Sequence, residues 1–130
     1  MYGIVNWYNQ SRGFGFAKDY YGNQYFIWHS ELIEGTKLSP NDIIAFNPLD
    51  KPKGLYAGDI RLLGEEEVHT VEFKLKMKTG DIYSSMPRNF PKDLDEDTMN
   101  NLGSNWVNKV ISRRNLDYES DVEECYMMTK

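Results

Sequence analysis

The sequence predicts a mainly β protein in two parts, a small five-stranded barrel or sandwich followed by a small α+β domain. The first half contains short runs of β-branched and aromatic residues separated by turn residues, without a helical period. The second half contains one strictly alternating strand and one segment with apolar residues at helical spacing. Between them, the acidic run 64–67 is typical of a short linker, because its like charges keep it solvated.

Five segments of the first half are expected to be strands, because each is rich in β-branched or aromatic residues. Simple alternation along the first of them places Gly3, Val5 and Trp7 on one side. The stretch 48–54 contains two prolines and is expected to be a loop. Five short strands without a connecting helix favour a barrel or sandwich over βαβ units. The expected strands are residues 2–8, 13–18, 24–29, 42–46 and 57–62.

The second half begins with a half-buried strand at residues 69–77. Val71, Phe73, Leu75 and Met77 share one face, and charged residues alternate with them. The turn after this strand allows a hairpin partner, which Pro87 is expected to end.

One helix is expected between the acidic cluster 93–97 and the basic pair at 113–114. Carboxylates at a helix start and cations at its end both complement the helix dipole. Apolar residues between them recur at intervals of three and four, as in an amphipathic helix. A last strand at 122–128 would complete a ββαβ order. We therefore expect a barrel at 1–63, a linker at 64–67 and an acidic α+β domain at 68–130.

The charge is unevenly distributed along the chain. The 130 residues include 15 Lys and Arg and 20 Asp and Glu, for a net charge of -5. Residues 1–63 hold six of each sign, so the whole acidic excess lies after Leu63. Net negative charge argues against non-specific duplex binding, which depends on phosphate neutralisation. Base stacking does not require a basic protein, and 14% of the residues are aromatic.

Several classes of protein are not expected. One cysteine, Cys125, cannot form an internal disulfide, and with two histidines it leaves no Cys/His set for structural zinc. No paired acid and base, nucleophile elbow or phosphate loop is present, so we expect no enzyme, no cofactor and no metal. No signal-peptide pattern or membrane-spanning run occurs, and we expect a cytoplasmic protein that does not contact membranes.

The aromatic spacing of the first half indicates a surface for flat ligands. In the run 12–16, Phe14 and Phe16 point to one face, and each is flanked by glycine, which leaves the rings unshielded. Phe26 and Trp28 share a face by the same rule. Strand aromatics are more often core residues, but a barrel this small buries one face, which its aliphatic residues already supply. Trp7 on the neighbouring strand extends the cluster.

Four segments closely resemble the cold-shock domain, including its two ribonucleoprotein-type motifs. They are residues 3–9 (GIVNWYN), 12–16 (RGFGF), 25–30 (YFIWHS) and the closing segment 53–60 (KGLYAGDI). The resemblance covers residues 1 to about 63 and implies a five-stranded OB-type Greek-key barrel that stacks bases of single-stranded RNA or DNA without catalysis. Carried over by position, the nucleic-acid-binding residues are Trp7, Tyr8, Arg12, Phe14, Phe16, Phe26, Trp28, His29 and Lys53.

Arg12 would lie near the strand backbone and Lys53 would contact a phosphate, although both could be ordinary solvated side chains. The sequence also departs from the family pattern. Asn6 stands where a lysine is usual, so one phosphate contact is expected to be missing. Trp28 replaces a usual histidine and His29 a usual aromatic or glutamine, which changes the edge chemistry of the surface. Gln24 replaces a usual acidic residue without an expected effect on binding.

We therefore expect a non-catalytic binding protein for single-stranded nucleic acid, RNA rather than DNA, that regulates transcription or RNA structure. The acidic domain at 68–130 is expected to bind a protein partner. Together with the linker it contains 14 Asp and Glu residues, which suit a protein-facing surface better than a nucleic-acid-binding one. Its alternate lysines, Lys74, Lys76 and Lys78, could extend a nucleic-acid track or simply protect a strand edge. In the alternative function, the exposed rings of the barrel anchor a protein such as an RNA polymerase subunit.

Overall fold

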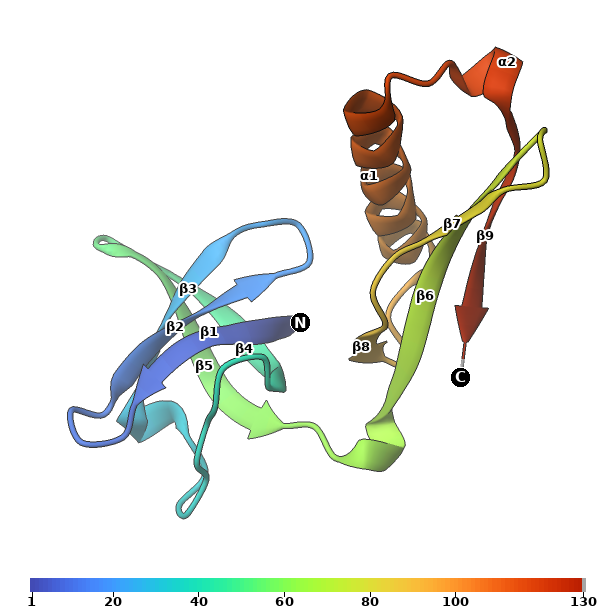
Figure 1. Cartoon of the computed structure of the whole chain (residues 1–130). Helices are drawn as coiled ribbons and strands as arrows, with labels where there is room; N and C mark the ends of the chain where they lie inside the picture. The colour runs from blue at the N-terminus through green and yellow to red at the C-terminus, as the bar shows by residue number, and fades with distance from the viewer. Residues whose placement is uncertain (130) are drawn as a thin grey trace. The chain divides into compact units, whose positions relative to one another are not determined.

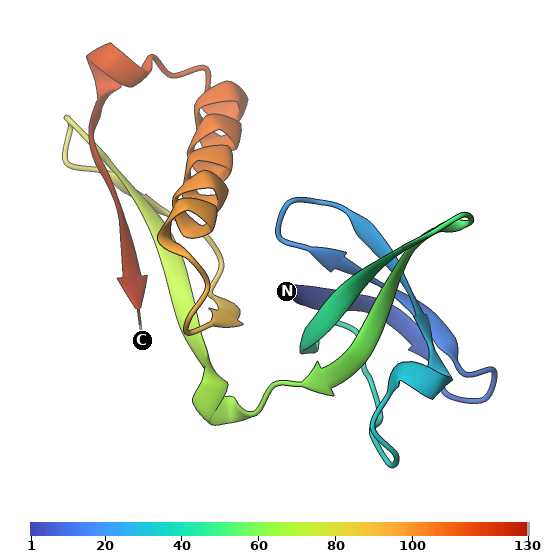
Figure 2. The same ribbon diagram turned by 180° about the vertical axis from the view of Figure 1, so that it is seen from behind.

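The computed structural model describes residues 1–129, so Lys130, the last residue of the expected second domain, lies outside the described residues. The chain divides into two compact units. The first unit is Met1–Glu67, and the second unit begins at Val68. The short 3₁₀ helix Glu65–Glu67, which covers most of the expected linker, is grouped with the first unit. Figures 1 and 2 show the elements of each unit.

The first unit is a closed five-stranded barrel, as predicted, with the strands in the order β1-β2-β3-β5-β4. β1 and β2 form an antiparallel hairpin, β3 pairs in parallel with β5, and β4 closes the barrel against β1. The interior consists of alternate residues, among them Val5, Ala17, Ile27 and Ile44, which are at most 1% exposed. The strands are β1 (Tyr2–Asn9), β2 (Phe14–Asp19), β3 (Gln24–Trp28), β4 (Ile43–Lys51) and β5 (Gly54–Leu62).

The expected loop at 48–54 is wrong, because β4 and β5 continue through it as a long hairpin. Asn47 pairs with Gly58, and the ladder continues as far as Lys51 opposite Gly54. β1 pairs only with residues 43–45 of β4, so Pro48 lies where β4 has β5 as its one paired neighbour. A proline is tolerated in such a position, because its missing N–H is not required by a second strand.

The expectation that Trp7 shares a side with Val5 is also wrong, because β1 contains a β-bulge. Val5 lies opposite Ala17 and Trp7 lies opposite Phe16, so Asn6 is an extra residue in β1. Val5 is buried, whereas Trp7 beyond the bulge is 40% exposed.

The second unit is a four-stranded antiparallel sheet with one long helix. β6 (Val68–Met77) is central, and β9 (Val122–Thr129) pairs along one edge. β7 (Ile82–Ser84) and β8 (Arg88–Pro91) share the other edge. The predicted alternation of β6 is confirmed, because its apolar residues are buried and its charged residues are half-buried.

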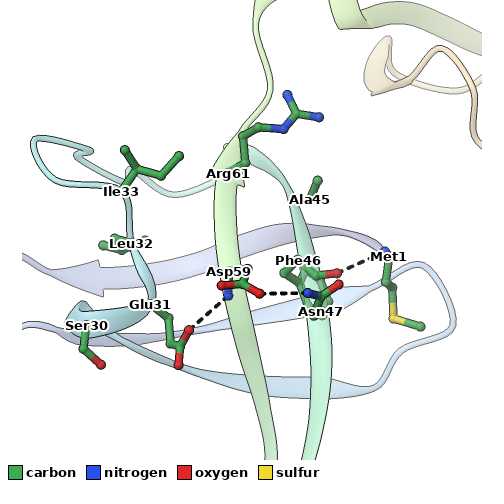
Figure 3. A pocket seen from close by; sticks show the side chains of 10 residues that line it. All are labelled: Met1, Ser30, Glu31, Leu32, Ile33, Ala45, Phe46, Asn47, Asp59 and Arg61. Carbon is green, nitrogen blue, oxygen red and sulfur yellow. Dashed lines mark hydrogen bonds between the residues drawn. The ribbon is translucent and has the colours of Figure 1, made fainter.

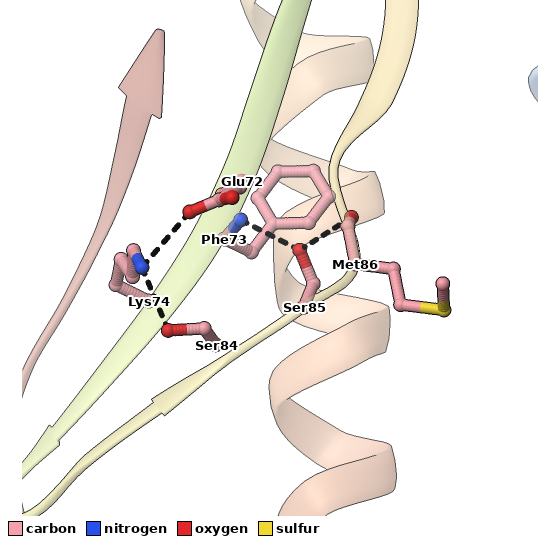
Figure 4. A network of polar contacts seen from close by, with 6 residues as sticks. All are labelled: Glu72, Phe73, Lys74, Ser84, Ser85 and Met86. Carbon is pink, nitrogen blue, oxygen red and sulfur yellow. Dashed lines mark hydrogen bonds and ion pairs between the residues drawn. The ribbon is translucent and has the colours of Figure 1, made fainter. Parts of the chain in front are cut away.

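The ββαβ order omitted β8, so this part of the prediction is incomplete. Ser85 bridges β7 and β8, because its N–H donates to the Phe73 carbonyl at 2.9 Å and its hydroxyl accepts from the Phe73 N–H at 2.8 Å. These bonds keep the chain beside β6 after β7 ends (Figure 4). Pro87 therefore interrupts the strand without removing the chain from the sheet.

The predicted helix is α1 (Glu96–Arg114), followed by the single turn α2 (Tyr118–Asp121). Asp95 caps α1 by accepting from the Thr98 hydroxyl at 2.7 Å and from the Thr98 N–H at 2.9 Å, and these hydrogen bonds hold the pKa of Asp95 below its usual value. Val107 is buried in a cluster with Leu75 and Met77 of β6, so α1 covers the apolar face of the strand (Figures 1 and 2).

Candidate nucleic-acid interface

Five rings of the first unit form one connected surface across β1, β2 and β3. We call this surface the aromatic platform. Along β2 and β3, inward residues such as Ala17 and Ile27 are buried, while the rings between them are half-buried or exposed. Trp7 and Trp28 are 40% and 41% exposed, although both are large apolar side chains. The platform consists of Trp7, Phe14, Phe16, Phe26 and Trp28.

Neighbouring platform rings are spaced for direct contact. The centroids of Trp7 and Phe16 are 5.4 Å apart, and those of Phe16 and Phe26 are 5.5 Å apart, both in edge-on geometry. Phe26 lies parallel to Trp28 at 6.2 Å and to Phe14 at 6.0 Å. These distances lie in the usual range for aromatic pairs, so the rings hold one another in place while their free faces remain accessible.

The bulge in β1 and the glycines of β2 position the platform. Asn6 is left out of the pairing with β2, so Trp7 lies opposite Phe16 on the outside although it is two residues after buried Val5. Gly15 lies opposite Tyr8, and an added Cβ at Gly15 would overlap the Trp7 carbonyl oxygen and lie 2.8 Å from the Tyr8 Cα. A glycine at this position therefore lets β1 and β2 approach closely under the rings.

Tyr8 differs from the other predicted rings, because it packs against the barrel core rather than on the platform. Burial raises the pKa of its hydroxyl. Tyr8 also lines a cavity of about 410 Å³ together with Arg12 and His29. Three of the predicted binding residues, Tyr8, Arg12 and His29, therefore line one cavity and are not part of the aromatic platform.

His29 lies beside the platform at the end of β3. The His29 ring centroid is 4.7 Å from that of Trp28, and the backbone N–H of His29 donates to the Gly13 carbonyl at 2.9 Å. Gly13 has a φ of 75°, and an added Cβ there would lie 2.9 Å from the His29 ring. Glycine is therefore required at residue 13 both by its backbone conformation and by the position of His29.

Two cold shock proteins are similar to this chain in sequence, whereas no protein-family model matches it. Major cold shock protein CspA of Pseudomonas aeruginosa is 33% identical over 64 residues, which cover 47% of this chain and 91% of that protein. Major cold shock protein of Micrococcus luteus is also 33% identical over 64 residues, covering 47% of this chain and 96% of that protein. The chain belongs to the cold-shock protein family.

This match confirms the family resemblance drawn from the motifs, and we refer to the first unit below as the cold-shock domain.

The β4–β5 hairpin of the domain carries two exposed lysines. Lys53, a predicted phosphate contact, lies at the turn between the strands. Lys51 lies at the end of β4, with its Nζ 4.6 Å from the centroid of the Tyr56 ring.

Tyr56 is a platform neighbour that the sequence reasoning missed. It lies opposite Phe26 where β5 pairs with β3, and the two ring centroids are 5.2 Å apart. The strand was expected to begin at residue 57 and the loop before it to end at residue 54, so Tyr56 was assigned to neither. The alternation of Tyr56 with buried Ala57 was the available signal, but pairing with β3 is a non-local contact.

Most carboxylates of the cold-shock domain are held in internal hydrogen bonds. Asp42 accepts from the Ser39 N–H at 2.8 Å. Buried Asp19 accepts from the Tyr25 hydroxyl at 3.0 Å, and burial together with this bond raises the pKa of Tyr25. The cations Arg12, Lys51 and Lys53, in contrast, are exposed. The balanced charge of residues 1–63 therefore coexists with exposed cations around the platform and its hairpin.

Two further carboxylates belong to a cavity of about 550 Å³ elsewhere on the barrel (Figure 3). Glu31 accepts from the Asp59 N–H at 3.0 Å, and Asp59 accepts from the Asn47 side-chain amide at 2.9 Å. None of the ten residues in Figure 3 belongs to the platform. This cavity and the aromatic platform are therefore separate surfaces.

The lysines of β6 in the second unit are engaged within that unit. Lys74 forms an ion pair with Glu72 at 2.9 Å and donates to the Ser84 hydroxyl at 2.7 Å (Figure 4). Lys76 pairs with Glu123 at 3.3 Å, and Lys78 beyond the strand donates to a backbone carbonyl. These contacts favour a structural role for the lysines over a nucleic-acid track.

Cys125 is a free thiol exposed on β9. Among the described residues, no helix combines the length and apolar character that crossing a membrane requires.

Proposed function

We propose that the cold-shock domain binds single-stranded nucleic acid, RNA in preference to DNA, by stacking bases on the aromatic platform. The observation that supports this most is the connected set of rings, with neighbouring centroids 5.4–6.2 Å apart and both terminal tryptophans about two-fifths exposed. Each stacked base contributes about 1–3 kcal/mol without requiring a particular base. The biological role we propose is regulation of transcription or of RNA structure.

The test is a tryptophan fluorescence titration of the full chain with oligouridylate and, in parallel, oligothymidylate of equal length. Trp7 and Trp28 should be quenched, while Trp106 in the second unit supplies a constant background. The change Phe14→Ala should weaken binding by about 1–3 kcal/mol, because it removes one stacking ring. Tyr21→Ala is the matched control, since Tyr21 is 64% exposed but belongs to a turn outside the platform.

The same titration distinguishes this function from the alternative, in which the rings anchor a protein. A folded chain that shows no quenching with either oligonucleotide at low salt contradicts stacking and favours the protein anchor. Salt dependence gives a second criterion, because each neutralised phosphate of a single strand adds about 0.7 to the logarithmic slope. We expect a shallow slope of about two or three phosphates, since Asn6 replaces a cation and the lysines of β6 are engaged in their own unit.

We also propose that the second unit binds a protein through the edge strand β9. Within residues 1–129, β9 pairs with β6 alone, and Met127 and Met128 are 42% and 50% exposed. A groove of about 500 Å³ between α1 and β9 has a mixed lining, in which Phe73 and Val107 are apolar and Asn100 and Ser104 are polar. The acidic excess of this unit favours an extended partner segment that carries basic and apolar side chains and adds to the sheet as a strand.

Capture experiments with the full chain test this second role. A protein retained by the unchanged chain but not by Met128→Lys would support binding at β9, because the substitution places a charge on the free edge. Lys92→Met, a substitution in the loop before α1, is the control. Equal retention by all three proteins would contradict a role for β9.

A further inference from the structure

The platform has a neighbour on the fifth strand of the barrel. β3 and β5 are parallel, and Phe26 lies opposite Tyr56 with ring centroids 5.2 Å apart and planes at 69°. The aromatic surface therefore continues from β1 across β2 and β3 to β5. Adjacent strands are separated by about 4.8 Å, so the Tyr56 ring on β5 lies directly beside the Phe26 ring on β3.

Tyr56 is not needed to fill the barrel interior. The neighbouring residue Leu55 packs against the core cluster, and Ala57 on the other side is 1% exposed. Tyr56 lies between these inward side chains and is half-buried on the outer face. A large aromatic residue at an outer position that the core does not use is available to a ligand.

The ring of Tyr56 is accompanied by a cation that has no competing ion pair. Lys51 Nζ lies 4.6 Å from the ring centroid, and within residues 1–129 no carboxylate pairs with Lys51. Lys51 and Tyr56 are neighbours because Leu49 lies opposite Tyr56, and Lys51 follows it on the same face of β4. An ammonium group above a ring that is still open to solvent is held by about 0.5–1 kcal/mol, less than the roughly 1–3 kcal/mol of a base stacked on that ring.

We propose that Tyr56 and Lys51 form an additional subsite for one nucleotide of a bound single strand. A base replaces the ammonium group on the Tyr56 ring, and the released Lys51 contacts the phosphate of the same strand. The pair thus matches both parts of a nucleotide, a flat base and an anionic phosphate. This inference rests on the proposed binding of single strands at the platform, and it assigns to the β4–β5 hairpin a role in setting the length of strand that the domain holds.

The test uses the full chain and oligouridylates that increase in length from about four to eight nucleotides, within the site sizes known for such barrels. For the unchanged chain, affinity should rise with length until the subsite is filled. In Tyr56→Ala this last increase, about tenfold, should be lost, while the affinity for the shortest strand that binds is unchanged. Tyr56→Phe should retain the increase because it retains the ring.

The cation is tested separately by Lys51→Met, measured on the longest strand. This change should lower the logarithmic salt slope by about 0.7, the value of one single-strand phosphate. Tyr56→Leu, which preserves apolar bulk without a ring, replaces Tyr56→Ala if the alanine variant does not fold by circular dichroism.

Two results would overturn the subsite while leaving the platform intact. One is an equal affinity of Tyr56→Ala and the unchanged chain at every length. The other is an equal loss at every length, which would indicate that Tyr56 supports Phe26 rather than a separate nucleotide. Failure of the unchanged chain to bind any of the strands would instead contradict the proposed function itself, and the subsite with it.

Discussion

The two units of this chain follow the same two-residue period but present different outer faces. In the cold-shock domain, outward positions of β2 and β3 carry rings such as Phe16 and Phe26. In the second unit, outward positions of β6 carry Glu72, Lys74 and Lys76, which find partners inside the unit. The period determines which side chains face outward. The residue types at those positions determine whether the face is satisfied internally or left for a ligand.

The cores are completed by different means as well. The barrel closes on itself, so its inward residues meet other inward residues of the same sheet. The sheet of the second unit is open and relies on α1 to cover Leu75 and Met77. A barrel therefore depends on close approach between its strands, whereas the open sheet depends on its helix. Three experiments test how the two units are stabilised, in order of decreasing expected effect.

The largest effect is expected from Gly15→Ala in the barrel, compared with Gly103→Ala in α1. An added Cβ at Gly15 would overlap the backbone of β1, so we expect a loss of about 3 kcal/mol in the free energy of unfolding. At Gly103 the added Cβ would lie 3.3 Å from the Phe73 ring, and the higher helix propensity of alanine, about 1 kcal/mol, offsets this contact. Urea unfolding should therefore separate the two variants, and similar losses in both would contradict the comparison.

A smaller effect is expected from Lys74→Met on the charged face of β6. The side chains of Lys74 and Glu72 are each 15% exposed, so Lys74→Met removes an ion pair that is largely shielded from water. We expect a loss of about 1 kcal/mol in the stability of the second unit, measured from its helical circular dichroism signal. Oligonucleotide affinity should not change. A clear loss of oligonucleotide affinity in Lys74→Met would instead indicate that the lysines of β6 contact nucleic acid.

The smallest effect concerns the start of α1 at low pH. The pKa of Asp95 is lowered in the folded state by its hydrogen bonds to Thr98. The charged cap therefore stabilises the helix fully above the unfolded pKa of about 4, and this contribution is lost as the pH falls through the lower folded pKa. Asp95→Asn can still cap the helix but does not titrate. It should unfold with a weaker pH dependence below about pH 4, and an unchanged dependence would exclude Asp95 as a source.

Local patterns in the sequence predicted the parts of the fold that depend on local order. Alternation in residues 12–16 placed Phe14 and Phe16 on one face, and the acidic cluster located the start of α1. Three features depended on contacts between distant segments. Tyr56 joins the platform through the β3–β5 pairing, β8 stays in the sheet through Ser85, and β4 extends past Pro48 because β5 lies beside it. These pairings join segments that are distant in the sequence, so the pattern within any one segment does not predict them.

The candidate site was predicted less completely than the fold. Five predicted rings form the platform. Tyr8 instead packs against the core, because the bulge at Asn6 changes which residues of β1 face inward. Alternation in the sequence does not reveal such a bulge. The sequence also drew attention to Lys53, while the lysine that contacts a ring is Lys51. The roles of all these residues in binding remain predictions for the titrations described above.

The bulge in β1 separates the number of residues in the strand from the face on which each ring lies. Substituting Asn6 leaves the register of β1 intact, because the residue count between Val5 and Trp7 is unchanged. Deleting Asn6 would place Trp7 directly after Val5, and regular alternation would still point Trp7 outward and Tyr8 inward. Chains with and without this one residue can therefore present the same rings on the same face of the barrel.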